Sequence, residues 1–360
     1  MQKKVRLAVA AENFSAGHGG ISRLARLMTK SILRNRYPLK AISLSDRVPP
    51  SDLGVPIRAC ATSRFSFVIN CSLAAFQTDR FLFDFAGMAR VNQYLLGPRR
   101  PFAVWMAGVE VWEDLRPDRR AALDAASLRL AISSYTRDRA ARVHGRYGDA
   151  KVCWLATDTD DEPRQRAGSI SGAPTVLLVA RIDEADKGHL ALINAWPEVI
   201  AAVPEARLVL VGGGSHYEQM CNLARRSPAG SRIELPGFVP EERMSEYWQR
   251  AHVYAMPSRV EGFGIAYVEA MRHGLPIIAS CEDAGQEINA DGVTGFNIRL
   301  DRTGELAARI IELLRNPDLA TQFGHQALQR WRDHFTFSRF HERFSAILDD
   351  WTGYSSNSNM

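Results

Sequence analysis

The chain alternates short apolar runs with stretches of helical periodicity, and this alternation restricts its fold more than any other feature. Strands that take turns with helices indicate βαβ units and parallel sheets, so we predict the α/β fold class. In the first part of the chain we predict strands near residues 5–10, 66–70, 102–106 and 129–132, and helices near 20–35, 87–96 and 117–126.

A second series of strands and helices follows a polar segment from Asp158 to Gly172. That segment carries Pro163 and Gly168 and lacks apolar periodicity, which is typical of a linker. After it we predict strands near 175–180, 207–211, 233–235, 253–255 and 276–279, and helices near 189–202, 215–226, 241–249, 264–273, 303–314, 317–332 and 338–351.

Two such series predict two Rossmann-like, doubly wound domains that face a cleft. We place the first domain at 1–160, the linker at 161–173, the second domain at 174–335 and a C-terminal helix within 336–354. Ligands of doubly wound sheets bind beyond the carboxyl ends of the strands. We therefore expect the functional site in the cleft.

Charge is uneven along the chain. Residues 1–165 carry 26 Lys and Arg against 16 Asp and Glu, whereas the remainder is acidic. A basic first half fits contact with an anionic membrane or a lipid-linked phosphate, although a solvated arginine-rich surface explains the same composition. Nucleic acid is not expected as a partner, because no basic-aromatic recognition module is visible.

Composition also bears on the compartment. No apolar run reaches the roughly 18 residues that a membrane-spanning helix needs. The five cysteines are scattered and form no C-x-x-C pair, which fits a reducing cytosol. We expect a cytoplasmic protein.

The segment from Pro257 to Ala270 places a polar, glycine-rich turn directly before an apolar helix. Glu261 lies in the turn and Glu269 follows eight residues later on the helix. A helix start offers unpaired N–H groups and partial positive charge, which suit a phosphate or a sugar hydroxyl. Carboxylates beside such donors favour a hydroxyl-rich, phosphorylated ligand such as a sugar nucleotide.

Lys187 stands out because the chain uses 39 arginines but only six lysines. A lone lysine at a predicted strand-to-helix junction indicates a need for a compact point charge. Together with Arg181 it would suit a diphosphate. The alternative is a structural lysine that pairs with Asp183 or Asp186.

With their flanks, these residues resemble the E-x7-E signature of retaining GT-B glycosyltransferases of the family four type (group 1 glycosyltransferases). The flanks read P-S-x-x-E-G-F-G before the helix and E-A-M-x-x-G-L-P-I-I-A-S through it. The resemblance implies catalytic roles for Glu261, Arg181 and Lys187, and ribose binding by Glu269. It implies further donor contacts by Gly19, Gly20, Val239, Gly262, Phe263, Gly264 and Ile265. It also implies that the final helix crosses back to the first domain.

Two segments of the chain differ from the family pattern or imitate another motif. The segment Trp105–Trp112 resembles the family's H-G-x-E-x-W turn, but Ala107 stands where the family has histidine. Asp158–Asp160 imitates a D-x-D metal motif but lies where the family has its linker loop. We expect no bound metal and no cofactor, because in the family arginine, lysine and helix N–H groups neutralise the leaving diphosphate.

The resemblance therefore predicts a retaining, metal-independent glycosyltransferase of the hexosyltransferase type. It would move a sugar from a nucleotide-diphosphate sugar to a saccharide or lipid-linked acceptor, in bacterial surface polysaccharide or glycolipid synthesis. A peripheral contact with the anionic inner face of the plasma membrane is a further hypothesis. The alternatives are a GT-B-fold pseudoenzyme that only binds sugar nucleotides, which Ala107 favours, and a sugar-nucleotide epimerase.

Overall fold

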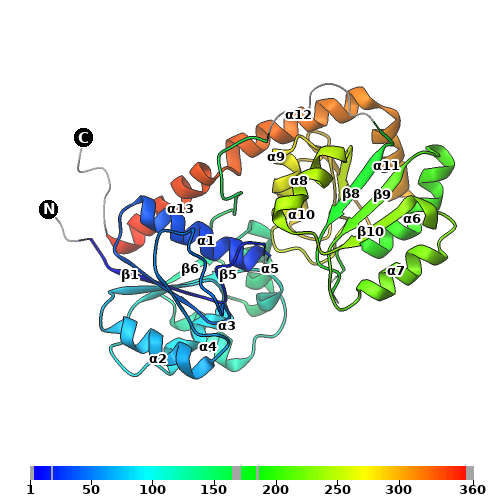
Figure 1. The fold of residues 1–360 in the computed structure, drawn as a ribbon. Helices are drawn as coiled ribbons and strands as arrows, with labels where there is room; N and C mark the ends of the chain where they lie inside the picture. Colours follow the sequence, from blue (N-terminus) through cyan, green and yellow to red (C-terminus); the bar gives the residue numbers. More distant parts are fainter. Residues whose placement is uncertain (1–3, 18, 164–171, 184–185, 354–360) are drawn as a thin grey trace. The chain divides into compact units, whose positions relative to one another are not determined.

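The computed structural model describes residues 4–17, 19–163, 172–183 and 186–353. The chain divides into two compact units, one of Met1–Thr159 with Thr336–Met360 and the other of Asp160–Phe335. Each unit contains one sheet (Figure 1), and the strand pairings within both sheets are parallel. Of the linker predicted at 161–173, residues 164–171 lie outside the described residues.

The sheet of the first unit has the strand order β3-β2-β1-β4-β5-β6-β7. Chain order reverses between β1 and β4, so these strands flank the switch point of the sheet. The strands are β1 (Leu7–Ala11), β2 (Leu39–Ser43), β3 (Ile57–Ala59), β4 (Arg80–Phe83), β5 (Phe102–Met106), β6 (Leu128–Ala131) and β7 (Lys151–Val152). The helices are α1 (Gly20–Arg34), α2 (Arg64–Ala75), α3 (Ala86–Ala89), α4 (Pro117–Ala125), α5 (Ser134–His144) and α13 (Phe337–Thr352), with short 3₁₀ turns η1 (Arg90–Gln93) and η2 (Val109–Val111).

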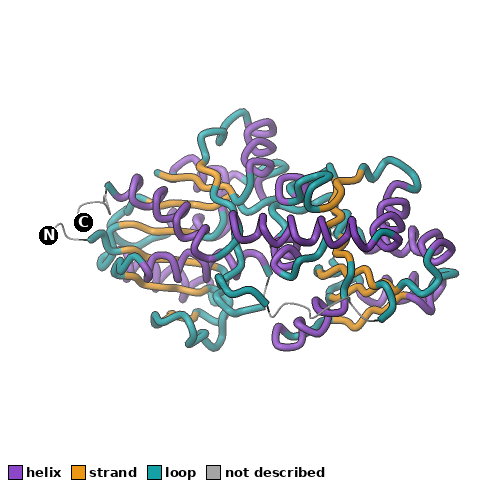
Figure 2. Tube along the Cα trace, turned by 90° about the horizontal axis from the view of Figure 1, so that it is seen from above, coloured by secondary structure: helices purple, strands orange, loops and turns teal. Residues whose placement is uncertain are grey.

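Helices cover both faces of this sheet, which explains its continuous apolar strands. β1 and β5 are buried along their whole length, as expected for strands of a parallel sheet covered on two sides. Figure 1 shows α1 and α13 on one side of the first sheet and α2, α3 and α4 on the other. Figure 2 shows its strands running side by side.

Helix α13 belongs to the first unit, although it comes last in the sequence. The Thr336 hydroxyl caps its start by accepting from the Arg339 N–H at 3.3 Å. Its apolar face inserts Phe340 and Phe344 against Trp105 of β5, with ring centroids 6.5 and 6.0 Å away. All three rings are buried, so α13 is part of this core.

The second unit repeats the architecture with the strand order β10-β9-β8-β11-β12-β13. Its switch point lies between β8 and β11. The strands are β8 (Thr175–Val179), β9 (Arg207–Val211), β10 (Ile233–Gly237), β11 (Val253–Ala255), β12 (Ile277–Ser280) and β13 (Gly295–Ile298). The helices are α6 (His189–Ala202), α7 (Tyr217–Arg226), α8 (Glu241–Arg250), α9 (Ile265–Arg272), α10 (Gly285–Ile288), α11 (Glu305–Arg315) and α12 (Pro317–His334), with the 3₁₀ turn η3 (Gly230–Arg232).

The prediction of a strand near 66–70 was wrong, because these residues form the middle of helix α2. Phe, Val and Ile in this run favour a strand by propensity. The Ser63 hydroxyl instead accepts from the Ser66 N–H and starts a helix, and Phe67, Cys71 and Ala74 recur at helical spacing on its buried side.

In the described part of the chain, no helix is both long enough and apolar enough to cross a membrane.

Phe344→Ala is expected to lower the free energy of unfolding of the first unit by about 3–5 kcal/mol, because it leaves a cavity beside Trp105 and Phe340. Urea unfolding followed by tryptophan fluorescence would measure this loss. Phe337→Ala is the matched control on the same helix, since Phe337 is only half-buried. Equal losses in the two variants would show that the α13 contact is not a core contact.

Candidate active site

Three loops meet at the carboxyl edge of the second sheet. They follow β8, β11 and β12, which are neighbours in the sheet order. The loop after β8 carries Arg181 and Lys187, the loop after β11 carries Glu261, and the loop after β12 carries Asp283. Because parallel strands end on the same side, residues distant in sequence converge at the switch point.

Lys187 and Glu261 form an ion pair between two of these loops. The Lys187 Nζ lies 2.9 Å from Glu261 Oε2 and 2.7 Å from the Val260 carbonyl oxygen, to which it also donates. The side chains are 19% and 20% exposed, so a ligand can still reach both. An ammonium has three N–H donors, and the contacts with described residues use two of them. The third remains for a ligand oxygen.

The Glu261 carboxylate retains acceptor capacity in this arrangement. Its Oε2 accepts from Lys187, and its Oε1 accepts from the Phe263 N–H at 3.3 Å. A carboxylate offers about four acceptor positions. Glu261 can therefore bind a hydroxyl while it stays paired with Lys187.

Asp283 fixes the backbone of the Glu261 loop. Its Oδ2 accepts from the Glu261 N–H at 2.9 Å, and its Oδ1 accepts from the Gly285 N–H at 2.8 Å. The Ala284 N–H in turn donates to the Glu261 carbonyl oxygen at 3.0 Å. Burial, and secondarily the nearby Glu261 carboxylate, raise the pKa of Asp283 to about 7. One buried carboxyl thus joins the loops after β11 and β12.

Helix α9 begins at a turn that only glycine fits. Gly264 has φ of +91°, and a β-carbon there would lie 2.2 Å from Cδ2 of Tyr267. The N–H groups of Gly264 and Ile265 make no hydrogen bond with other described residues. Open donors at a helix start favour an anion. The buried Phe263 ring anchors the same turn by packing on Phe335, with centroids 6.1 Å apart.

Glu269 lies on α9 and is half-buried. Its charge reaches the Tyr254 hydroxyl, whose pKa is raised well above its usual range, first by burial and then by Glu261 and Glu269. The two carboxylates of the predicted signature therefore act on one buried group. Tyr254 also packs edge-to-face on Tyr267, with ring centroids 5.8 Å apart.

The other predicted residues differ in exposure. Arg181 is 83% exposed, and its Nε lies 3.4 Å from Asp183 Oδ2. Val239 follows β10 and is half-buried, and Gly262 is buried in the Glu261 loop. Gly19 and Gly20 are exposed at the start of α1, in the first unit. The structure thus brings together Lys187, Glu261 and residues 262–265 of the prediction.

Asp283 is the functional residue that the sequence interpretation missed. A signal was present, since Glu282-Asp283 stands between a predicted strand and Gly285. A carboxylate before a helix start commonly accepts from the first N–H groups. This pattern of two acidic residues did not distinguish a residue of the site from an ordinary helix N-cap.

The structure shows the surroundings of Ala107 and of the D-x-D-like segment at Asp158–Asp160. The Ala107 N–H donates to Glu110 Oε1 at 2.6 Å, and the His144 ring bonds the Val111 carbonyl oxygen at 2.9 Å, so this turn is closed without a histidine at position 107. Asp158 of the D-x-D-like segment pairs with Arg23 at 2.8 Å and Lys30 at 3.3 Å. Over the described ranges, no group of three His, Cys, Asp or Glu side chains is arranged to hold a metal ion.

A cation, a carboxylate with spare acceptors and open helix N–H groups at the switch point of a Rossmann-like sheet define a site for an anionic, hydroxyl-rich ligand. Residues 159–330 match the family model described as "Glycosyl transferases group 1". The second unit is therefore similar to the group 1 glycosyltransferases over nearly its whole length.

Curated relatives of this chain include mannosyltransferases. The chain is 29% identical over 248 residues to the GDP-mannose-dependent alpha-(1-6)-phosphatidylinositol monomannoside mannosyltransferase of Mycolicibacterium smegmatis, covering 62% of this chain and 65% of that protein. It is 34% identical over 174 residues to the phosphatidyl-myo-inositol mannosyltransferase of Mycobacterium leprae, covering 46% of this chain and 45% of that one. The chain thus spans less than two thirds of the length of either relative.

Solved structures share the fold along nearly the whole chain. HepE of Anabaena, solved with UDP and glucose, is 17% identical with a TM-score of 0.78, covering 96% of this chain and 100% of that one. Sucrose-phosphate synthase of Thermosynechococcus elongatus is 19% identical with a TM-score of 0.81, covering 97% and 100%. The prediction of two Rossmann-like domains of the GT-B type is confirmed.

Asp283→Asn is expected to flatten the pH dependence of the free energy of unfolding between about pH 4 and pH 7. The folded-state pKa of about 7 lies above the unfolded value near 3.9, so the folded protein binds this proton more tightly. The proton on Asp283 therefore makes its full contribution to the free energy of unfolding below about pH 4. This contribution is lost as pH rises through about 7, with a slope of at most about 1.4 kcal/mol per pH unit.

Urea unfolding at several pH values would measure the slope for wild type, Asp283→Asn and the control Asp318→Asn. Asp318 is exposed in the first turn of α12 in the same unit, so its variant should keep the wild-type slope. Equal slopes in wild type and Asp283→Asn would contradict the role of Asp283.

Proposed function

We propose that this protein is a retaining glycosyltransferase that moves a hexosyl group from a nucleotide-diphosphate sugar to an acceptor hydroxyl. One observation carries the proposal: the Lys187 ammonium, the Glu261 carboxylate and the open N–H groups of Gly264 and Ile265 converge at the switch point of the second sheet. These groups match the diphosphate and the sugar hydroxyls of one donor molecule.

The reaction breaks the bond between sugar C1 and the diphosphate oxygen and forms a bond from C1 to the acceptor oxygen. Negative charge grows on the departing diphosphate, where Lys187 and the N–H groups at the start of α9 stabilise it. Arg181 is exposed and can turn toward the same phosphates. In a retaining reaction the acceptor attacks on the face of the leaving group, and its proton passes to a diphosphate oxygen. No histidine is needed for that transfer, so Ala107 is compatible with it.

The carboxylates have separate roles in this scheme. Glu261, held by Lys187 and by its own backbone contact with Asp283, binds the sugar and favours positive charge at C1. Glu269 would accept from the ribose hydroxyls. The donor binds through protein groups alone, without a metal or cofactor.

GDP-mannose is the first donor to test, since the curated relatives are GDP-mannose-dependent or mannosyl-transferring enzymes. Those relatives act on phosphatidylinositol derivatives, as their names state. A lipid-linked or saccharide acceptor of bacterial glycolipid or polysaccharide synthesis, used at the cytoplasmic face of the membrane, fits both this similarity and the basic composition of residues 1–165.

Lys187→Ala and Glu269→Ala are each expected to weaken donor binding about tenfold or more, because a hydrogen bond to a charged group contributes about 1.5–3 kcal/mol. Titration calorimetry with GDP-mannose, UDP-glucose and ADP-glucose on the full chain would measure this. Glu198→Ala is the matched control, an exposed glutamate on α6 of the same unit, and should bind as wild type does.

An assay of sugar transfer to an acceptor distinguishes an enzyme from a pseudoenzyme. Donor binding with no product from a broad panel of lipid and saccharide acceptors would favour the pseudoenzyme, and conversion of the sugar without an acceptor would favour the epimerase. Proton NMR of the product gives the anomeric configuration, and an inverted centre would contradict retention.

A further inference from the structure

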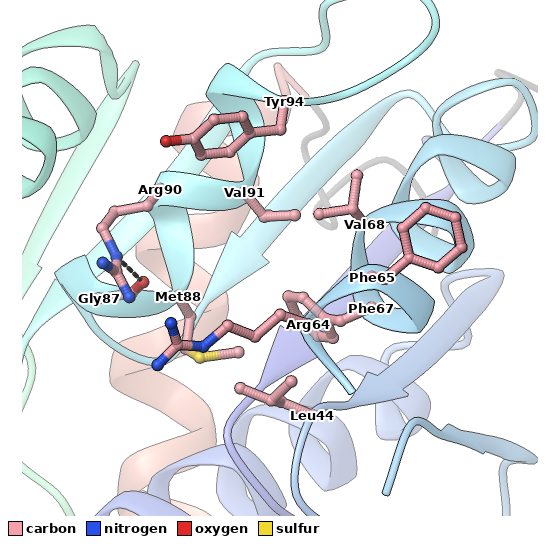
Figure 3. Close-up of a pocket in the computed structure, with 10 residues that line it drawn as sticks. All are labelled: Leu44, Arg64, Phe65, Phe67, Val68, Gly87, Met88, Arg90, Val91 and Tyr94. Atoms are coloured by element: carbon pink, nitrogen blue, oxygen red, sulfur yellow. Dashed lines mark hydrogen bonds between the residues drawn. The ribbon is translucent and has the colours of Figure 1, made fainter. Parts of the chain in front are cut away.

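A pocket of about 330 Å³ lies in the first unit, at the carboxyl edge of its sheet. Its walls come from Leu44, just after β2, from the first turns of α2, and from α3 and η1 after β4 (Figure 3). Figure 3 shows Val68 of α2 and Val91 of η1 facing each other across it. Its volume is at the lower end of the roughly 300–1,000 Å³ typical of small-molecule sites. The glycine turn after β1 follows the carboxyl end of that strand, so it lies at the same edge of the sheet.

An exposed apolar stripe continues from this pocket. It consists of Phe65, Leu73 and Phe76 of α2 and its end, with Tyr94 and Leu96 of the following segment; these side chains are 56–78% exposed. The Leu96 N–H donates to the Ser72 hydroxyl at 3.0 Å, which holds the two segments together. The stripe contains five of the eleven large apolar side chains that are exposed in the described chain, so they are concentrated at this place.

Helix α2 is apolar on two faces. Phe67, Cys71 and Ala74 form its buried face, whereas Phe65 and Leu73 lie on the other side of the helix. No charged residue occurs from Phe65 to Thr78. A surface helix normally carries polar residues on its outer face, and a contiguous exposed apolar patch marks an interaction site.

One cation at the pocket, Arg64, has no partner among the residues that the structure describes. Arg64 is exposed and makes no hydrogen bond or ion pair with the described residues, and Figure 3 shows its side chain reaching along the pocket toward Met88. The other lining arginine is occupied, because Arg90 donates to the Gly87 carbonyl oxygen and pairs with Asp118 at 2.8 Å. Arg64 therefore leaves a positive charge for a ligand beside the apolar walls.

The basic side chains of α1 are engaged inside the unit. Arg23 and Lys30 pair with Asp158, Arg26 pairs with Asp52, and α1 packs on α13. Helix α2, in contrast, carries both an exposed cation and exposed apolar side chains.

We propose that the α2 pocket binds the hydrocarbon chain of an anionic lipid, whose phosphate contacts the Arg64 guanidinium while the apolar stripe rests on the membrane surface. An apolar cavity with one unpaired cation and a charge-free helix face is complementary to an amphiphile with a phosphate head. A water-soluble phosphate would leave the apolar walls uncovered. This inference deepens the proposed function, because the lipid would carry or accompany the acceptor hydroxyl.

Titration calorimetry with the full chain tests the pocket with three probes: dihexanoyl phosphatidylglycerol below its micelle concentration, dihexanoyl phosphatidylcholine, and glycerol 3-phosphate. We expect glycerol 3-phosphate to bind at least tenfold more weakly than the phosphatidylglycerol. Phe65→Ser should weaken binding of both lipids at least fivefold. Arg64→Ala should remove the preference for phosphatidylglycerol over phosphatidylcholine.

Val143→Ser and Arg142→Ala are the matched controls, an exposed valine and an exposed arginine on α5 of the same unit, and both should bind lipid as wild type does. Co-sedimentation with phosphatidylcholine vesicles, with and without phosphatidylglycerol, should show the same ranking. Equal binding of glycerol 3-phosphate and lipid would overturn the proposal in favour of a free-phosphate site. A dimer that dissociates in Phe65→Ser, without lipid binding by wild type, would overturn it in favour of a second copy of the chain.

Titration of the same protein preparations with nucleotide sugars distinguishes the lipid-pocket proposal from the proposed glycosyltransferase function. Lipid binding without nucleotide-sugar binding would count against the proposed function and leave the lipid pocket supported. Nucleotide-sugar binding and transfer to a saccharide, without lipid binding, would overturn the pocket assignment alone.

Discussion

The arrangement of the candidate active site depends on one buried carboxyl. Asp283 accepts the backbone N–H groups of Glu261 and Gly285 and so joins the loops after β11 and β12. Glu261, placed in this way, meets Lys187 from the loop after β8. A carboxyl buried between two N–H donors is costly to desolvate and is retained only where its hydrogen bonds are satisfied. The site is therefore preorganised before any ligand binds.

The two units offer different chemistry at equivalent edges of similar sheets. In the second unit the strand ends present an ion pair and open helix N–H groups, which suit phosphate and hydroxyls. In the first unit they present an apolar pocket and Arg64, which pairs with no residue that the structure describes. A shared architecture thus holds sites of opposite polarity, because the loops and helix starts, and not the buried strands, determine what each edge can bind.

Sequence patterns predicted most of the second unit correctly. The helix near 189–202 and the strands near 207–211 and 253–255 have the predicted bounds in the structure. Long apolar periodicity and β-branched runs carry that signal by themselves. The same reasoning failed at 66–70, where a β-prone run became helix α2, and it omitted the strands β2, β3, β4, β7 and β13 and the helix α5. Strands are stabilised largely by their neighbours in the sheet, and local propensity does not report those contacts.

The sequence by itself determined the class of the protein. The alternation of strands and helices predicted two Rossmann-like domains, and the E-x7-E segment with the lone Lys187 predicted a glycosyltransferase with its candidate site in the second unit. Only the tertiary structure decided that Lys187 pairs with Glu261, that Asp283 holds the Glu261 loop, and that α2 exposes an apolar face beside Arg64. These facts depend on which strand ends become neighbours and which helix faces are covered. Both follow from the packing of distant segments, which spacing along the chain does not specify.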